Sequence, residues 1–397
     1  MREPSPGALA GLIVVDASRV LAGPYAAMLL GDLGASVVKV EQPGSGDDTR
    51  RWGPPFTEAG DSAYYLAVNR GKRGVAIDLR QDAGRGVFYA LLARADVLIE
   101  NFKAETREAF ALSGEATGRR FPRLVHAAVS GFGATGAFAS RPGYDNVAQA
   151  ASGLMSITGP ADGEPHKVGV AVSDLAAGLH AAVAILAAVR HRDATGAGQF
   201  VDVSLFDASL GLLANVASSA LVSREEPKRW GNAHPSIVPY QTVRAADRPF
   251  MLAVGNDLQF QTLCQVLEAP RWADDPRFST NPARVRHRDA LLPMIEERLS
   301  RRPADAWLAV LEAAGIPAGP VRTVPEALSS PEAAEREMVV RVGGVPMVAP
   351  VPKLNKTPAR VASRPPRLGE HTDAVLADLL GYDPARIAGL RAAGAIA

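Results

Sequence analysis

Short β-branched runs alternate with Ala- and Leu-rich stretches through the first third of the chain. The strand-like runs are LIVVDAS (12–18), SVVKVEQP (36–43), GVAIDL (74–79) and the segments 96–102 and 123–133. The helix-like stretches are PYAAMLLGDLG (24–34), which Gly34 closes, and GRGVFYALLARA (84–95). In this order each helix can cover the sheet while the chain returns to a parallel strand. The alternation predicts an α/β fold whose large domain is Rossmann-like with a parallel sheet.

The character of the sequence changes further along the chain. A polar, Pro-bearing segment at 223–239 follows the long helical region and is typical of a domain boundary or a functional loop. Beyond it, a strand-like run and three helix-like stretches predict a smaller α+β unit, with segments at 250–254, 257–268, 288–299 and 303–314. Short strands, a Pro-rich connector and two helices, roughly 372–381 and 384–393, complete the chain. The predicted organisation is a large domain over 1–222, a small domain over 223–330, and a C-terminal segment, 331–397, that returns to the large domain.

Charge and cysteine content exclude several classes of protein. The 43 Lys and Arg residues balance 42 acidic residues, so a net charge of +1 gives no global basis for nucleic-acid binding. The single cysteine, Cys264, cannot form an internal disulfide, and no Cys or His cluster has metal-site spacing. The apolar run 8–15 is predicted to be a strand and not a signal peptide, and the segment 175–189 is shorter than the roughly 20 residues that span a bilayer. These features predict a cytoplasmic protein without a bound metal, a membrane span or a nucleic-acid partner.

Neither of the common nucleotide-binding motifs occurs in its usual context. GxxxxGK[ST] is absent, and the one GxGxxG match, at 131–136, is not followed by a helix pattern, so an ordinary dehydrogenase or NTPase loses its main support. Gly44 and Gly46 are interpreted as turn residues because no helix pattern follows them. The basic cluster at 69–73 fits either a solvated turn or a site that binds phosphate through Arg and Lys.

Ser173 and Asp174 stand where an extended run gives way to a helical one. One interpretation is a helix N-cap. The other is catalytic, because the helix macrodipole favours an ionised carboxylate that can act as a nucleophile or base. The histidines on apolar or surface-helix patterns receive no functional role; they are His126, His180 and His191.

Several longer motifs occur in order along the chain. They are RVLAGPYAAMLLGDLGASVVKVEQPGSGDDTR (19–50), YYLAVNRGKRGVAIDL (64–79), ADVLIENF (95–102), SGFGATG (130–136), RPGYDNVAQAASGLMSITG (141–159), VGVAVSDLAAGLHAA (168–182), GIPAGPV (315–321) and LGEHT (368–372). Together they resemble the family III CoA-transferases from about residue 10 to the C-terminus. The resemblance implies an interlocked homodimer, a CoA thioester as substrate, a carboxylic acid as acceptor, and no prosthetic group.

The resemblance also implies a role for Asp174. At this position the transferases carry an aspartate that attacks the donor thioester and becomes an aspartyl-CoA thioester. The α-methylacyl-CoA racemases of the same family carry His where this chain has Tyr144, and a phenol with a pKa of about 10 is a poor proton carrier near neutral pH. The transferase is therefore favoured over a racemase or epimerase, and a non-catalytic CoA-binding protein stays as a further alternative. Asp145 and Asp202 are the next candidates for a covalent carrier.

Further site residues follow from the same resemblance. The positions it implies for CoA binding are Val20, Leu21, Ala22, Gln42, Asn69, Lys72, Arg73, Asn101, Phe102, Arg107 and Tyr144. Arg107 is included as a substitute, because Ala109 stands where most members carry an arginine for CoA phosphate. Backbone N–H groups of a Gly-rich loop are expected to stabilise oxyanions.

Two segments are similar to the succinyl-CoA:glutarate CoA-transferases within the family, KRWGNAHPSIVPYQ (228–241) and GNDLQF (255–260). The similarity implies a dicarboxylic acyl-CoA donor such as succinyl-CoA. It also places four residues near the acyl groups, namely Arg229, Asn232, Ala233 and His234, with Arg229 or His234 able to pair with a distal carboxylate. Leu21 stands where formyl-CoA transferases carry Gln, which argues against formate and oxalate as partners.

Overall fold

The structure, a computed structural model, describes residues 7–397 and divides into two compact units. Unit 1 comprises 7–154, 167–225 and 331–397, and unit 2 comprises 155–166 and 226–330. The predicted boundaries at 223 and 331 lie close to these limits, whereas 155–166, which the prediction assigned to the large domain, is part of unit 2. The independence of the two units as folding domains stays a prediction.

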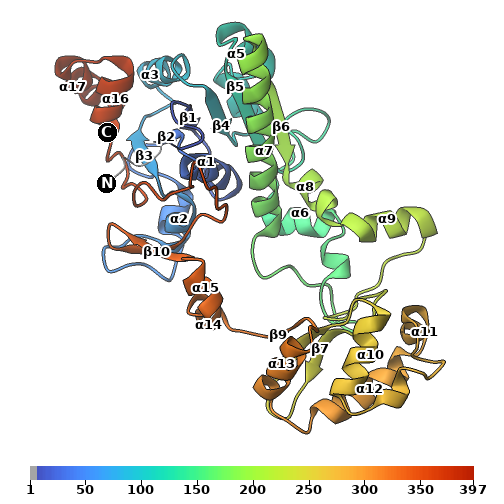
Figure 1. Cartoon of the computed structure of the whole chain (residues 1–397). Coiled ribbons are helices and arrows are strands. Elements are labelled where there is room, and N and C mark those ends of the chain that lie inside the picture. The colour runs from blue at the N-terminus through green and yellow to red at the C-terminus, as the bar shows by residue number, and fades with distance from the viewer. Residues whose placement is uncertain (1–6) are drawn as a thin grey trace. The chain divides into compact units, whose positions relative to one another are not determined.

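A six-stranded parallel sheet forms the centre of unit 1, which confirms the predicted α/β class (Figure 1). Its strands are β1 (Ile13–Asp16), β2 (Ser36–Glu41), β3 (Lys72–Ala76), β4 (Val97–Glu100), β5 (Val125–Ser130) and β6 (Phe200–Ser204). They lie in the order β3-β2-β1-β4-β5-β6, with Val14 opposite both Val37 and Val97. Strand order reverses between β1 and β4, and in such sheets ligands bind beyond the carboxyl ends of the strands at this point.

Helices cover both faces of this sheet. The helices of unit 1 are α1 (Ala22–Asp32), η1 (Asp48–Arg51), α2 (Ala63–Val68), α3 (Asp82–Leu92), α4 (Ala104–Ala109), α5 (Gly114–Arg120), α6 (Asp145–Ala151), α7 (Val172–Thr195), α8 (Leu205–Leu212), α9 (Ala214–Ser223), α15 (Pro331–Glu335), α16 (Thr372–Leu380) and α17 (Pro384–Ala392). On one face, α1 and α7 pack in a core with Val14 and Val37, and on the other α3 and α16 pack with Val15 and Val38. Successive strand residues thus serve opposite faces, as the two-residue period of a strand requires.

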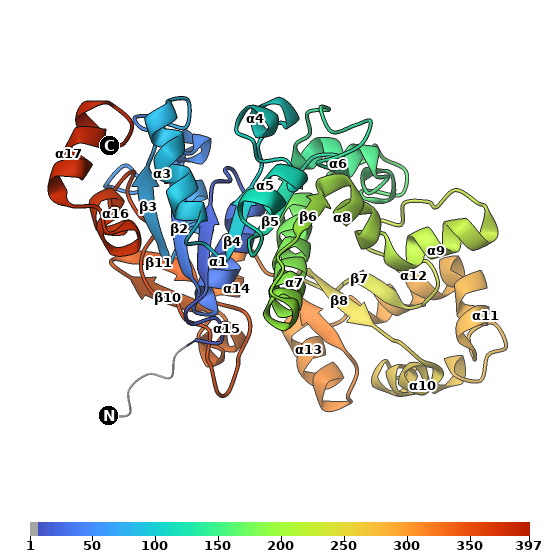
Figure 2. The same ribbon diagram turned by 90° about the horizontal axis from the view of Figure 1, so that it is seen from above.

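The C-terminal segment completes unit 1. A hairpin of β10 (Val339–Val342) and β11 (Val345–Val348) precedes α16, which lies beside β3 and α3 (Figure 2). The Thr372 hydroxyl accepts a hydrogen bond of 3.1 Å from the Ala76 N–H, and Ile396 forms a β-bridge with Ile77. The chain end therefore covers the edge strand of the parallel sheet.

Helix α7 is the long crossover between β5 and β6, and it packs closely on α1. A Cβ atom at Gly178 would lie 2.7 Å from the Ala22 carbonyl oxygen, so only glycine permits this approach. α7 is longer than the predicted segment 175–189, and by length and hydropathy it could cross a membrane; the absence of a membrane span stays a prediction. Half of its apolar window is buried in unit 1, as in the core helix of a globular fold.

Unit 2 is an antiparallel sheet covered by helices. Its strands are β7 (Tyr240–Arg244), β8 (Pro249–Ala253) and β9 (Ala318–Pro320). Its helices are η2 (Met155–Ile157), α10 (Asp257–Val266), η3 (Pro270–Trp272), α11 (Asn281–Arg286), α12 (Arg288–Leu299), α13 (Ala304–Ala313) and α14 (Val324–Leu328). Phe250, Phe260 and Leu291 are fully buried in its core. The mixed α and β content of this region was predicted.

Candidate active site

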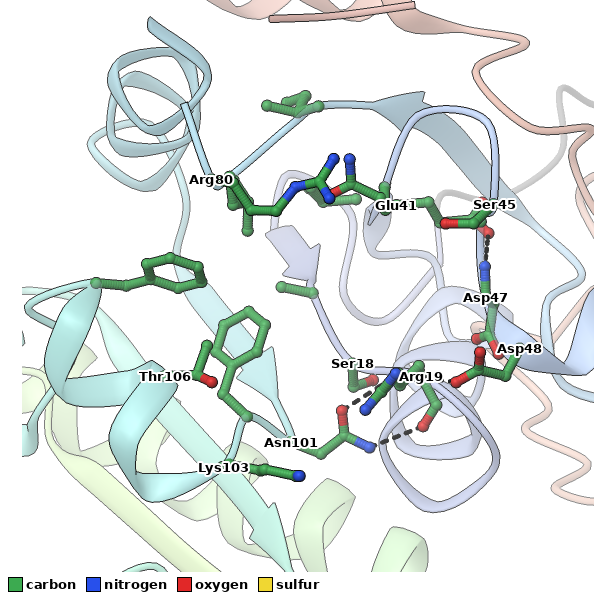
Figure 3. Close-up of a pocket in the computed structure, with 18 residues that line it drawn as sticks. Ser18, Arg19, Glu41, Ser45, Asp47, Asp48, Arg80, Asn101, Lys103 and Thr106 are labelled. Atoms are coloured by element: carbon green, nitrogen blue, oxygen red, sulfur yellow. Dashed lines mark hydrogen bonds and ion pairs between the residues drawn. The ribbon is translucent and has the colours of Figure 1, made fainter. Parts of the chain in front are cut away.

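The largest cavity described lies at the carboxyl edge of the parallel sheet, beside the reversal between β1 and β4. It has a volume of about 470 Å³ and is lined by residues that follow β1, β2, β3 and β4 (Figure 3). The predicted residues Gln42, Asn101 and Phe102 all line it. Asn101 also fixes the chain after β1, because its amide accepts from the Arg19 N–H at 3.0 Å and donates to the Arg19 carbonyl at 2.8 Å.

Three further cavities in unit 1 share lining residues with this cavity or with one another. A 300 Å³ cavity shares Arg19, Asn101 and Lys103 with the first. A 100 Å³ cavity shares Val20 and Tyr144 with it, and reaches Leu21, Ala22 and Asp174. The last cavity, of 230 Å³, also contains Val20, Tyr144 and Asp174 among its lining residues. Neighbouring cavities therefore share wall residues, and Asp174 lines both the 100 Å³ and the 230 Å³ cavity.

Asp174 lies in the first turn of α7 and is 9% exposed. It is not the N-cap: the N-cap position is Ala171, and the side chain that caps the helix comes from Asp145 at the start of α6. One Asp145 oxygen accepts from the backbone N–H groups of Ser173 at 2.8 Å and Asp174 at 3.2 Å. The N-cap interpretation of Ser173 and Asp174 is therefore wrong. No hydrogen bond to the Asp174 carboxyl is found among residues 7–397.

The ionisation of Asp174 also differs from the expectation. Burial, followed by the negative charge of Asp145, raises the pKa of Asp174 to about 7. The position at a helix N-terminus predicts that this carboxyl stays ionised. That prediction is wrong because desolvation and a like charge outweigh the macrodipole and raise the pKa.

Val20 faces the same cavities from a strained loop. Its φ is +73°, a left-handed conformation that β-branched residues rarely adopt. The Val20 N–H donates to both carboxylate oxygens of Asp47, at 3.2 and 3.3 Å. Asp47 in turn pairs with the buried ammonium of Lys39 at 3.1 Å, and Lys39 donates to the Ser18 carbonyl. A buried ion pair thus holds the loop whose Val20 lines the same cavities as Asp174.

The basic cluster at 69–73 has a structural role. Lys72 is fully buried and pairs with Asp16 at 2.8 Å, and it also donates to the Asn69 side chain and the Pro24 carbonyl. Asn69 is fully buried as well. Neither side chain reaches a surface where it could bind phosphate, which corrects their predicted role. Arg73 is partly exposed and pairs with Asp378 at 3.2 Å, and it lines none of the cavities described above.

Arg107 is also turned away from solvent. Its guanidinium is buried against Glu100 at 2.7 Å and donates to the Ala134 and Phe102 carbonyls. The proposed substitution for the missing family arginine is therefore wrong. The exposed cations at the large cavity are Arg19, Arg80 and Lys103, which the sequence analysis missed because single surface cations carry no pattern.

The predicted acyl-binding residues all belong to unit 2. Arg229 donates to three backbone carbonyls, those of Ser156, Pro160 and Gly163, and so anchors the segment 155–166. The Asn232 amide donates to Thr242 at 3.2 Å, Ala233 lies in the same turn, and the His234 ring stacks on Tyr240. The contacts of Arg229 indicate a structural role, and the roles of Asn232, Ala233 and His234 stay predictions.

Aromatic side chains surround the Asp174 cavity. Tyr144 is 64% exposed and lines three cavities, as its predicted role requires. Trp52 and Tyr64, which the sequence analysis missed, stack edge-to-face at 5.1 Å and line the 230 Å³ cavity. Burial, with contributions from Asp174 and Asp145, raises the pKa of Tyr64 to about 12. Over the described residues no cluster of His, Cys, Asp and Glu is arranged to hold a metal ion.

Comparison with known proteins agrees with this arrangement. The chain is 39% identical over 393 residues to human succinyl-CoA:glutarate CoA-transferase, covering 98% of this chain and 90% of that protein. It is 42% identical over 381 residues to succinate–glutarate CoA-transferase of Agrobacterium fabrum, covering 94% and 95% of the two chains. Acetyl-CoA:oxalate CoA-transferase of Acetobacter aceti is 41% identical over 352 residues, covering 87% and 90%.

A solved structure and a family model also match most of the chain. A crystal structure of a CAIB/BAIF family protein from Brucella suis superposes with a TM-score of 0.85 at 44% identity, covering 94% of this chain and all of that one. The model of CoA-transferase family III matches residues 9–372. The motifs that resemble this family therefore reflect membership, and the chain is a CoA-transferase of family III.

Proposed function

We propose that the enzyme moves CoA between dicarboxylic acids through a covalent Asp174 intermediate. The observation that supports this most is the position of Asp174, a buried residue that lines two cavities and whose carboxyl has no hydrogen-bond partner among the described residues. A structural aspartate at a helix start normally caps the helix, but here Asp145 has that role. Asp174 is thus left available to substrate.

The reaction follows from carboxylate chemistry. The ionised Asp174 attacks the thioester carbonyl of the donor, which forms a mixed anhydride and releases CoA thiolate. The thiolate attacks the Asp174 carbonyl of the anhydride, releasing the donor acid and leaving an aspartyl-CoA thioester. The acceptor carboxylate then attacks this thioester to form a second anhydride, and the released thiolate attacks its acyl carbonyl. The products are the new acyl-CoA and free Asp174, with no net gain or loss of protons.

The size of the cavities suits CoA. The 470 Å³ cavity offers exposed cations, Arg80 and Lys103, for phosphate groups, and Phe102 packs edge-to-face on Phe110 at 5.6 Å beside them. Such a combination suits an adenine nucleotide. From there the narrower cavities would take the pantetheine arm towards Asp174.

A dicarboxylic substrate fits the 230 Å³ cavity. Lys167 is the one cation among the described residues that line it, and its ammonium donates to the Val168 carbonyl at 3.3 Å. We therefore assign Lys167, in place of Arg229, to the distal carboxylate of the acyl group. The names of the human and Agrobacterium relatives support succinate and glutarate. The Acetobacter relative brings oxalate back among the acceptors to test, although Leu21 argued against it.

Exposed apolar side chains on three helices support the expected homodimer. They are Leu179 and Val183 on α7, Leu210 and Leu212 on α8, and Leu221 and Val222 on α9, with Val222 87% exposed. Such a surface is unusual for a protein without a partner. A sedimentation coefficient that matches a monomer at micromolar concentration would contradict the dimer. A cytoplasmic location remains part of the proposal.

The covalent intermediate can be tested directly. The intact protein is mixed with succinyl-CoA, its mass is measured, and the adduct is captured with hydroxylamine or reduced with borohydride. On the peptide that contains 168–180 we expect a mass increase after hydroxylamine, which leaves a hydroxamate, and a mass decrease after borohydride, which leaves an alcohol. Both changes should be absent from Asp174→Asn. Transfer of CoA to glutarate and to oxalate is followed in parallel by the mass of the product thioesters. Turnover without any covalent adduct would reject the proposed mechanism, and no transfer to any acid would reject the dicarboxylate substrates.

A further inference from the structure

A second carboxyl, Asp145, lies next to the proposed nucleophile and is built into the fold. It is 7% exposed and stands at the first position of α6. One of its oxygens accepts from the N–H groups of Ser173 and Asp174, and the other accepts from the Gln149 amide at 2.6 Å. All three donors are protein groups, so the position of this carboxylate is fixed before any substrate binds.

Gln149 connects this carboxylate to the segment that precedes α7. It is fully buried, and while its amide nitrogen donates to Asp145, its amide oxygen accepts from the Val168 N–H at 2.9 Å. Ser173 is anchored separately, through a hydrogen bond of 2.7 Å from the Ser209 hydroxyl. The first turn of α7 is thus held by side chains of α6 and α8, and none of these bonds uses the Asp174 carboxyl.

Five ionisable side chains share the cavities with Asp174. Arg19 and Tyr144 line the 100 Å³ cavity, and Tyr64, Asp145, Lys167 and again Tyr144 line the 230 Å³ cavity. Arg19 pairs with Asp48 at 2.9 Å, and the Lys167 ammonium donates to the Val168 carbonyl at 3.3 Å. The Asp145 carboxylate accepts from the Asp174 N–H at 3.2 Å, and its charge raises the pKa of Asp174.

We infer that Asp145, oriented by Gln149, is a positioning residue that caps α7 in place of Asp174 and whose charge favours the covalent CoA-bound form of Asp174 over the free carboxylate. This inference rests on the covalent mechanism proposed above. A free Asp174 carboxylate faces a like charge in a buried site, whereas an Asp174 thioester carries no charge. Formation of the thioester therefore removes the repulsion, and the equilibrium between free and covalent enzyme shifts towards the covalent form.

The effect depends on pH in a defined direction. Repulsion acts only on ionised Asp174, so its contribution to the equilibrium grows as pH rises through about 7 and is constant above. Without the Asp145 charge, Asp174 ionises at lower pH, and the acid limb of the acylation rate moves to lower pH. Each pKa unit removed lowers the equilibrium constant for covalent enzyme by about tenfold at pH 8.

The chain offers a pair of substitutions that moves the charge and keeps the hydrogen bonds. In Asp145→Asn alone, the new amide NH2 faces the NH2 of Gln149, and two donors cannot form a hydrogen bond. This variant therefore loses the hydrogen bond to Gln149 as well as the negative charge. In the double variant Asp145→Asn with Gln149→Glu, the new amide oxygen accepts from Ser173 and Asp174, and its NH2 donates to the new carboxylate. The second oxygen of that carboxylate accepts from Val168. The negative charge then lies one hydrogen bond further from Asp174.

The test measures an equilibrium as well as a rate. Wild type and the double variant are mixed with succinyl-CoA and increasing succinate at pH 8 and pH 6, and the covalent fraction is read from the intact mass. We expect the double variant to keep the wild-type melting temperature, to give a several-fold smaller equilibrium constant at pH 8 than wild type, and to differ less at pH 6. Its acylation rate should show an acid limb displaced to lower pH.

The outcomes separate the inference from the proposed function. A double variant with the same equilibrium constant and the same acid limb as wild type would show that Asp145 is only a helix cap, and the inference fails while the covalent mechanism stands. If the double variant melts below wild type, Asp145→Glu, which keeps the charge, must retain the wild-type equilibrium constant for the inference to hold. Wild-type enzyme that forms no adduct at any pH would overturn both.

Discussion

Two of the groups of buried charges in unit 1 differ in how their charges are compensated. Beneath the loop at 18–21, Asp16 and Asp47 are paired with Lys72 and Lys39 at 2.8 and 3.1 Å. At the start of α7, Asp145 and Asp174 are both acidic. Burial disfavours the ionised form of Asp16, but Lys72 and Lys39 outweigh it and lower the pKa of that carboxyl. Burial and Asp145 instead raise the pKa of Asp174.

The difference separates structure from chemistry. A compensated charge is held in one state and fixes the backbone around it, as Asp47 fixes Val20. An uncompensated carboxyl is destabilised as an ion and is therefore prepared to react or to bind a proton. Val20, which Asp47 holds, lines the same two cavities as Asp174, so one group positions a wall of the site and the other supplies its reactive group.

The largest effect expected concerns the reactive group. Asp174→Asn should reduce turnover by more than about a thousandfold, a rise of about 4 kcal/mol in activation free energy, because the amide cannot form the anhydride. Steady-state transfer from succinyl-CoA measures it. Asp193→Asn, at the exposed end of the same helix, is the matched control and should retain normal turnover. A residual rate above about a tenth of wild type would show that Asp174 is not the carrier.

A large loss of stability is expected when the compensated group is broken. Lys72→Met leaves Asp16 buried without its closest cation, and removal of one partner of a buried pair costs about 3–5 kcal/mol. Urea unfolding of the whole chain measures the change. Arg119→Met breaks the exposed pair with Glu115 and should shift the midpoint little. Equal shifts for the two variants would show that the buried group does not stabilise the fold.

In the acidic pair, Asp145 and Asp174, removal of a charge should stabilise the fold. Because the pKa of Asp174 is about 7 in the folded protein and 3.8 in the unfolded chain, its ionisation opposes folding. The cost is absent below about pH 4, grows up to about pH 7 and is constant above it. Asp174→Asn carries no charge, so it should raise the melting temperature more at pH 8 than at pH 5. If Asp174→Asn melts at a lower temperature than wild type at pH 8, the ionised Asp174 does not destabilise the folded protein.

Local pattern was sufficient to predict much of the fold. The alternation of β-branched and Ala-rich segments located β1, α1 and β2, and the predicted helix at 288–299 coincides with α12. Sheet order and the packing of the C-terminal helices on β3 depend on contacts between residues far apart in sequence. The basic cluster at 69–73 shows the limit: Lys72 is buried because β3 brings it to Asp16, 56 residues earlier in the chain.

The site was predictable only where it depends on local sequence. Asp174 was identified through the family resemblance, and its first-turn position follows the local helical pattern. Its raised pKa could not be predicted, because it depends on burial and on Asp145, whose contact with the α7 backbone joins residues 28 and 29 positions apart. A single cation such as Lys167 has no signature in the sequence until the cavity around it is known.

The smallest effect is expected for Lys167, and it tests how the uncompensated acidic site binds its substrate. The 230 Å³ cavity is lined by Asp145 and Asp174, and its one cation among the described lining residues is Lys167. Lys167 has no carboxylate partner among residues 7–397. If it binds the distal carboxylate of the acyl group, Lys167→Met should raise KM for succinyl-CoA about tenfold and leave KM for butyryl-CoA unchanged. Lys103→Met, in the large cavity, is the matched control and should raise both KM values by similar factors. Equal losses for Lys167→Met with both donors would show that its charge serves CoA, and the dicarboxylate would then need another cation.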